Sequence, residues 1–199
     1  GNALAKAMLQ DVWSVLTEAN YGNSAITTTA SGGDQLTVTA ANFDLDEVSW
    51  LYAACSLDNW PSVPRSLILS VPYYAQLFRE SEVVGTDGAK DEMLQQAVIR
   101  QLMGFDIYET NAISSAATDN VTGFAAHPDG VLVAGRVLLP EAGIANRPTV
   151  QVMTEPETGV SIVMREWFDA DNDQSKRVLE VAYGYLKGNA NAIKLISSS

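Results

Sequence analysis

Two segments near the carboxyl end, residues 161–168 and 176–186, have the pattern of long β-strands, and they constrain the fold more than any other feature of the chain. A strand at 161–168 places Ile162, Met164 and Glu166 on one side and Val163, Arg165 and Trp167 on the other. The acidic stretch FDADNDQ at 168–174 separates them. Two such strands around a short polar turn predict an antiparallel hairpin, and a further strand is expected at 149–153.

The preceding part of the chain mixes helical and strand patterns. Apolar residues at helical spacing predict one long helix over 2–20 and a second over 44–57. The second begins with Asp44 and has Glu47 three positions later, which is the pattern of a capping box. Other elements are expected as follows: helices from Pro72, over 91–103 and from about Pro128, and strands at 36–39, 66–71, 105–109 and just before His127. Helices and strands that do not alternate as regular βαβ units indicate an α+β protein.

Composition limits the classes of partner. The chain has 199 residues, 47% of them hydrophobic, which suits one large domain or two small ones with a sizeable core. Twelve basic residues face 24 acidic ones, and the net charge of −12 disfavours binding to nucleic acid or to an anionic membrane surface. No apolar run reaches the roughly 18 residues that a membrane-spanning helix needs, so no membrane partner is expected.

The acidic stretch also resembles the ligand ladder of a calcium-binding loop. Positions 1, 3, 5, 7 and 12 of such a loop would be filled by Asp169, Asp171, Asp173, Ser175 and Glu180. The sixth position, where a sharp bend calls for glycine, is Gln174, and the eighth is Lys176. Because the flanking segments also alternate like strands, a solvated hairpin turn is favoured. A calcium-dependent binding module is kept as an alternative function.

No group of residues predicts catalysis. The single cysteine, Cys55, excludes an internal disulfide, indicates a reducing setting and is expected to be a buried structural thiol. The single histidine, His127, is expected to have a capping or packing role, and a zinc site could use only these two residues with carboxylates. Glu155 and Glu157 lie in a predicted turn. The tryptophans are scattered at positions 13, 50, 60 and 167. We therefore predict no catalytic, cofactor-binding or metal residues, no cofactor and no enzyme activity.

Four blocks of sequence, taken in order, resemble the major capsid proteins of tailed phages. The first, LDEVSWLYAACSLDNWPSVPRSLILSVPYYAQLF at 45–78, has a helix, a proline-containing loop, an arginine, an apolar strand and a proline-started helix. QLMGFDIYETNAI at 101–113 and TGFAAHPDGVLVAGRVL at 122–138 are similar to the next two blocks of that family. VSIVMREWFDADNDQSKRVLEVAYGYLKG at 160–188 is similar to its closing pair of long strands. Each block is weakly specific alone, but the ordered set covers nearly the whole chain.

The resemblance implies an HK-97-type phage capsid fold with a long spine helix at 2–20. It also implies a peripheral domain from 1–66 with about 150–182, and an axial domain from 67–149 with about 183–199. In this family an N-terminal arm and an extended loop normally precede the spine helix, and they are missing from these 199 residues. No crosslinking residue can be carried over.

The implied function is a structural subunit of an icosahedral phage or prophage head that self-assembles into pentamers and hexamers. The implied partners are copies of itself and a scaffold protein, and the implied shell encloses DNA without sequence-specific binding. The implied location is the virion, after synthesis in the bacterial host cytoplasm. An encapsulin-type nanocompartment shell shares the fold and is a second alternative.

Overall fold

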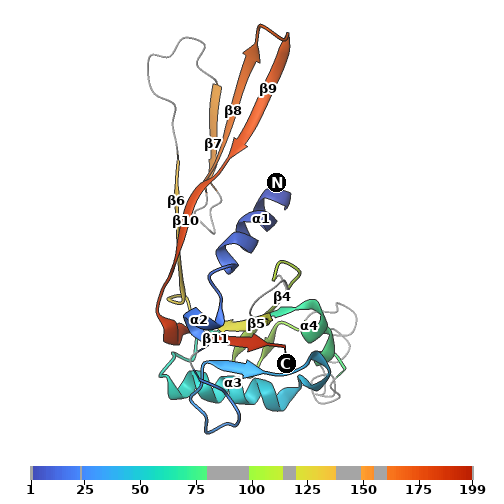
Figure 1. Ribbon diagram of the computed structural model, residues 1–199, viewed down its shortest axis with the longest axis vertical. Helices are drawn as coiled ribbons and strands as arrows, with labels where there is room; N and C mark the ends of the chain where they lie inside the picture. Colours follow the sequence, from blue (N-terminus) through green and yellow to red (C-terminus); the bar gives the residue numbers. More distant parts are fainter. Residues whose placement is uncertain are drawn as a thin grey trace. The chain divides into compact units, whose positions relative to one another are not determined.

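The computed structural model describes residues 2–22, 24–79, 99–113, 120–137, 149–154 and 161–198 (Figure 1). The helices are α1 (Asn2–Trp13), α2 (Glu18–Tyr21), α3 (Leu45–Leu57) and α4 (Val71–Leu77), with short 3-10 helices η1 (Ala40–Asn42) and η2 (Ala190–Ala192). The strands are β1 (Gln35–Thr37), β2 (Ser66–Ser70), β3 (Gln101–Leu102), β4 (Phe105–Thr110), β5 (Val121–Ala126), β6 (Val131–Arg136), β7 (Thr149–Thr154), β8 (Ser161–Asp169), β9 (Gln174–Glu180), β10 (Ala182–Lys187) and β11 (Ile193–Ser197). The α+β class is thus confirmed.

The chain forms two compact units. Unit 1 contains residues 1–131 and 187–199, and unit 2 contains residues 132–186. The peripheral and axial domains implied by the resemblance are drawn with other bounds than these units, and their assignment stays a prediction.

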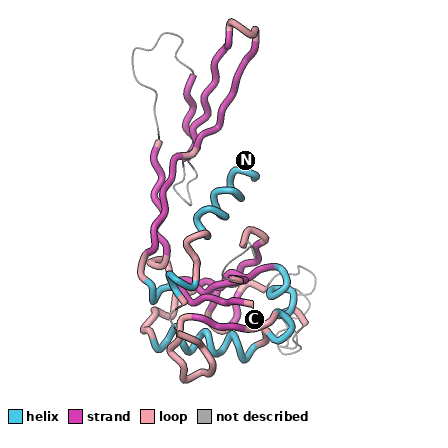
Figure 2. Tube along the Cα trace, viewed as in Figure 1, coloured by secondary structure: helices cyan, strands magenta, loops and turns pink. Residues whose placement is uncertain are grey.

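Unit 1 is built on a six-stranded sheet of order β1-β11-β5-β2-β4-β3. Figure 2 draws the strands in magenta and the helices in cyan. The pairs β1–β11 and β2–β4 are parallel, and the other neighbours are antiparallel. The last strand of the chain, β11, inserts between β1 and β5. Both faces of the sheet are buried: Leu67 and Leu69 of β2 belong to one hydrophobic cluster, whereas Ile68 between them packs against a second.

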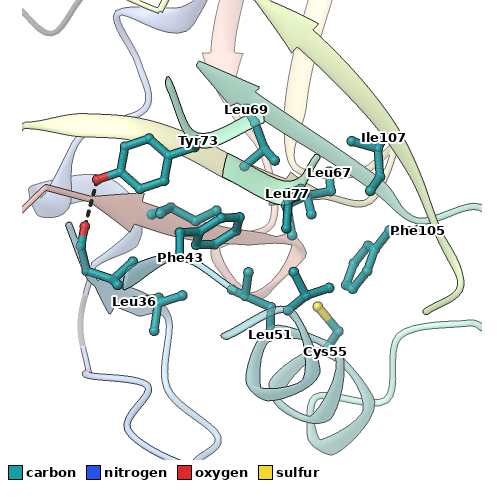
Figure 3. Close-up of a cluster of buried hydrophobic side chains, with 14 of the residues drawn as sticks. Leu36, Phe43, Leu51, Cys55, Leu67, Leu69, Tyr73, Leu77, Phe105 and Ile107 are labelled. Atoms are coloured by element: carbon teal, nitrogen blue, oxygen red, sulfur yellow. Dashed lines mark hydrogen bonds between the residues drawn. The ribbon is translucent and has the colours of Figure 1, made fainter. Parts of the chain in front are cut away.

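The larger cluster lies between the sheet and helices α3 and α4. The capping box predicted for α3 is confirmed, since Asp44 accepts a hydrogen bond from the backbone of Asp46 and Glu47 accepts one from the backbone of Asp44. Figure 3 shows Leu51 and Cys55 of α3 among the labelled core side chains of the strands and α4. The hydroxyl of Tyr73 crosses this core and donates a hydrogen bond of 2.6 Å to the carbonyl of Val38.

The expected single helix over 2–20 is interrupted. Helix α1 ends at Trp13, a turn follows, and α2 begins at Glu18. The side chain of Asn20 donates to the carbonyl of Val15 at 2.8 Å and thereby satisfies a backbone group of the turn. Of the apolar face expected along this helix, Val12 and Leu16 are buried, Met8 and Val15 are half-buried and Ala19 is exposed.

The helix expected from about Pro128 is wrong, because residues 127–130 form a turn and β6 follows at once. Proline is as well suited to the second position of a type I turn as to the start of a helix, and glycine suits the fourth. The backbone N–H of Gly130 closes this turn on the carbonyl of His127 at 3.0 Å.

Two other expected elements also differ. Most of the helix expected over 91–103 lies outside the described residues, but its predicted end is wrong, because Gln101–Leu102 is β3. β3 pairs with β4 through a turn in which Met103 and Gly104 both have positive φ. The single strand expected over 176–186 is broken at Val181 into β9 and β10, which belong to different sheets.

Candidate assembly surface

The acidic stretch is a hairpin turn, as predicted. β8 and β9 are paired from Val163 opposite Glu180 to Asp169 opposite Gln174. Within the turn, the Asp169 carboxylate accepts hydrogen bonds from the Lys176 ammonium, from the Asn172 amide at 2.9 Å and from the Asp171 backbone N–H at 3.2 Å. The bonds from Lys176 and Asn172 lower the pKa of Asp169 to about 2.

The extended hairpin keeps the calcium ladder from converging on one cation. Glu180 lies six residues along β9 from Gln174, which is roughly 20 Å at the rise of a β-strand. Its carboxylate instead pairs with Arg165 Nε at 2.9 Å. Within the described part of the chain, no group of three His, Cys, Asp or Glu side chains is arranged to hold a metal ion.

Cys55 is fully buried on α3. Burial raises the pKa of its thiol to about 12, which leaves the group protonated and unreactive at neutral pH. The prediction of a buried structural thiol is confirmed.

His127 lies at the turn after β5, and its neighbours fit a packing role. Its Nδ1 is 3.5 Å from a carboxylate oxygen of Asp129, and its ring centroid is 6.0 Å from that of Trp60. Its backbone N–H donates to the carbonyl of Ala192 at 2.9 Å. These contacts link β5 to η2 and involve no nucleophile.

The other singled-out residues do not form a shared site. Glu155 and Glu157 lie outside the described residues. Trp13 packs edge-on against Phe124, and Trp60 is buried with its indole N–H on the carbonyl of Asn191. The remaining two tryptophans are half-buried, on α3 and β8. Aromatic side chains spread over different elements do not build a common binding platform.

Arg65, which belongs to the first block of the capsid resemblance, organises the loop between α3 and β2. Its guanidinium is buried and donates to the carbonyls of Pro61 and Trp60, both at 2.8 Å, and to the hydroxyl of Ser56 at 3.1 Å. It also lies over the ring of Tyr52 at 5.0 Å. These contacts give the arginine of the motif a structural role.

Unit 1 contains a buried ion cluster that no sequence motif indicated. Lys194 on β11 is fully buried, and its ammonium contacts the carboxylates of Asp34, at 2.7 Å, and Asp58. Asp34 precedes β1, and Asp58 caps the carboxyl end of α3. The cluster therefore joins three distant segments at one side of the core.

Unit 2 has a different construction, because its described residues form little hydrophobic core. It contains the two-stranded sheet β10-β6 and the three-stranded antiparallel sheet β7-β8-β9. Among the described residues of this unit, only Val163 is a buried hydrophobic residue. Stable domains bury the apolar faces of their sheets against a second layer, so this unit carries apolar surface that calls for a covering partner.

Residues that face one another across paired strands share one face of the sheet, so the register of β7, β8 and β9 sorts their side chains. One face, here called the methionine face, carries the apolar residues Met153, Ile162, Met164, Phe168 and Leu179. The opposite face, here called the valine face, carries Val150, Val152, Val163, Trp167 and Val178. The solvent-facing side of a single sheet is usually polar. Both faces of this sheet carry apolar residues instead.

The methionine face is the more exposed of the two. Phe168 is 60% exposed, Met153 55% and Leu179 48%, whereas on the valine face Val152 is 43% exposed, Val178 38% and the central Val163 only 2%. The charges on the methionine face are balanced, because Arg177 Nε bonds to Glu166 Oε1 at 3.0 Å directly across the strands. The result is an open apolar surface whose ionic groups neutralise each other.

No described helix is long and apolar enough to cross a membrane.

Comparison with known proteins gives a result at the level of structure. No protein-family model matches the sequence, and the curated proteins contain no match. The structure is similar to a chain in the capsid structure of the cyanophage P-SCSP1u, with a TM-score of 0.61 and 13% identity over 100% of this chain. It is also similar to a chain in the asymmetric unit of the mature capsid of bacteriophage PhiM1, with a TM-score of 0.53 and 11% identity over 99% of this chain.

These matches confirm, at the level of the fold, the resemblance to phage capsid proteins that the sequence blocks indicate. The present chain spans 63% of the cyanophage chain and 60% of the PhiM1 chain.

Proposed function

We propose that this protein is a structural subunit of a tailed-phage or prophage head. The observation that carries the proposal is the structural match of the whole chain to chains from two phage capsids. The four ordered sequence blocks support it independently. In finer detail, we propose an HK-97-type fold in which α1 belongs to the spine helix and the subunits assemble through pentamers and hexamers.

The physical properties of the chain suit a shell. A wall that encloses dense DNA functions best when it does not bind phosphates, and a net charge of −12 opposes such binding. Subunits of closed shells contact each other through several modest interfaces related by rotation, and unit 2 supplies apolar surface for such contacts. The proposed location is the virion, after synthesis in the host cytoplasm, and a scaffold protein is a proposed additional partner.

Negative-stain electron microscopy of the purified chain at high concentration tests the proposal. Rings or closed shells are the expected result. A preparation that contains only monomers at every concentration would count against the capsid function. The encapsulin-type alternative predicts shells that are filled with protein cargo.

A further inference from the structure

We propose that the methionine face of the β7-β8-β9 sheet (Met153, Ile162, Met164, Phe168 and Leu179) packs against a second copy of this chain. The inference deepens the proposed function, because it assigns one surface of the subunit to contact between copies. It rests on the exposure, the charge and the size of that surface.

The exposure of its apolar side chains makes the methionine face a candidate contact surface. Three large apolar side chains, Phe168, Met153 and Leu179, each expose about half or more of their surface. The register places Met153 and Leu179 in adjacent rows with Ile162 and Met164, and Phe168 lies beyond the row of Glu166 and Arg177 on the same face. Flexible methionine side chains adapt well to a partner surface, which favours burial over solvation here.

Charge favours a second copy as the partner. Two chains that each carry a net charge of −12 repel each other over most of their surface. On the methionine face, the carboxylate of Glu166 is neutralised by Arg177. Two copies can therefore approach through this face without bringing unpaired carboxylates together. The same two residues can exchange partners between copies, so the face is complementary to itself.

Size sets the strength of the contact. β8 has nine residues and spans roughly 30 Å, and three strands are roughly 14 Å wide, so the face covers about 400 Å² in projection. A standard stable interface buries about 800 Å² per partner. The face alone is thus expected to give weak association, in the micromolar range or weaker. Such a contact becomes effective when several are made together in a closed shell.

Neighbouring positions on β9 provide a matched test. Leu179 is 48% exposed on the methionine face, and Val178 is 38% exposed on the valine face. Leu179→Asp and Val178→Asp place the same charge one residue apart on opposite sides of one strand. Sedimentation velocity over a concentration series measures association, and circular dichroism checks that each variant is folded. We expect Leu179→Asp to weaken association at least about tenfold and Val178→Asp to leave it within about threefold of the unchanged chain.

A second pair, Met153→Asp and Val152→Asp on β7, repeats the comparison on the other edge of the sheet, so the test stands if one β9 variant fails to fold. Equal association of the two members of a pair, or a greater loss for the valine-face variant, would overturn the inference while leaving a capsid function intact. A monomeric unchanged chain at every concentration would also overturn it. Association through the methionine face without rings or shells would support the inference and count against the proposed function.

Discussion

The buried ion cluster of Lys194 gives the sharpest prediction for the stability of unit 1. The Lys194 side chain is fully buried, and its ammonium contacts two carboxylates, from Asp34 and Asp58. Lys194→Met removes the charge and keeps an unbranched apolar side chain of similar length. The substitution therefore leaves two neighbouring carboxylates without their shared cation and creates little cavity.

The loss of unfolding free energy in Lys194→Met follows from opposing electrostatic contributions. At the 2.7 Å between the ammonium and Asp34, an effective dielectric constant of 20 gives an attraction of roughly 6 kcal/mol. The attraction between Lys194 and Asp58 adds to this value. Desolvation of the lysine and repulsion between the two carboxylates offset much of both attractions. Breaking a buried pair by removing one partner typically costs about 3–5 kcal/mol. Because Asp34 and Asp58 remain 15% and 22% exposed and gain water, we expect about 2–4 kcal/mol.

Urea unfolding followed by tryptophan fluorescence measures the loss, since Trp60 is buried in unit 1. With a denaturant slope of about 2 kcal/mol per M, the midpoint is expected to fall by about 1–2 M. The control is the triple variant Lys194→Met, Asp34→Asn, Asp58→Asn, which removes every charge of the cluster and is expected to regain most of the stability. A Lys194→Met midpoint within 0.3 M of the original, a threshold of about 0.6 kcal/mol, would refute the reasoning. A triple variant no more stable than the single one would refute it too.

Three further predictions concern single side chains. Burial and the hydrogen bond with Asp44 raise the pKa of Glu47 from 4.5 to about 7, so its stabilising contribution is present below pH 4.5 and lost as pH rises to about 7. Glu47→Gln keeps a capping acceptor and should reduce the change of the urea midpoint with pH between pH 4.5 and 7. A midpoint that changes with pH as much as in the unchanged chain would contradict this. Tyr73→Phe leaves the buried carbonyl of Val38 without its donor and should lower the free energy of unfolding by about 1–3 kcal/mol in the same assay, whereas no loss would show that water replaces the hydroxyl. Cys55, with a pKa of about 12, should not react with a thiol reagent such as DTNB at pH 8 until urea unfolds the protein, and rapid reaction of the folded chain would disprove its burial.

Local sequence signals predicted the fold wherever one or two neighbouring residues decide the backbone. Asp44 and Glu47 identified the start of α3, because a capping box needs only these two positions. Pro128 misled the prediction, because proline suits both a helix start and a turn. The turn is held by backbone hydrogen bonds to the carbonyls of Gly130 and Asp129. Their donors, the N–H groups of Gly188 and Asn189, lie far away in the sequence.

The strand β11 shows a second limit of local signals. Lysine is normally exposed, so Lys194 in the middle of an apolar segment argues against a buried strand. Its carboxylate partners lie 160 and 136 residues away in the sequence, and only the folded chain brings them together. No spacing rule connects residues so distant. The ion cluster was therefore beyond the reach of motif analysis.

Unit 2 shows why the candidate surface could be only partly predicted. The alternation along 161–168 correctly separates Ile162 and Met164 from Val163, but it places apolar residues on both sides of the strand. For a sheet in a single chain, such a pattern fails to say which side is the core. In the structure, neither side of the sheet is buried over most of its area. Val163 alone among the described residues of this unit is a buried hydrophobic residue. A strand pattern with two apolar sides, in a unit whose described residues form no second layer over them, is the pattern expected from the proposed contact between copies of the chain.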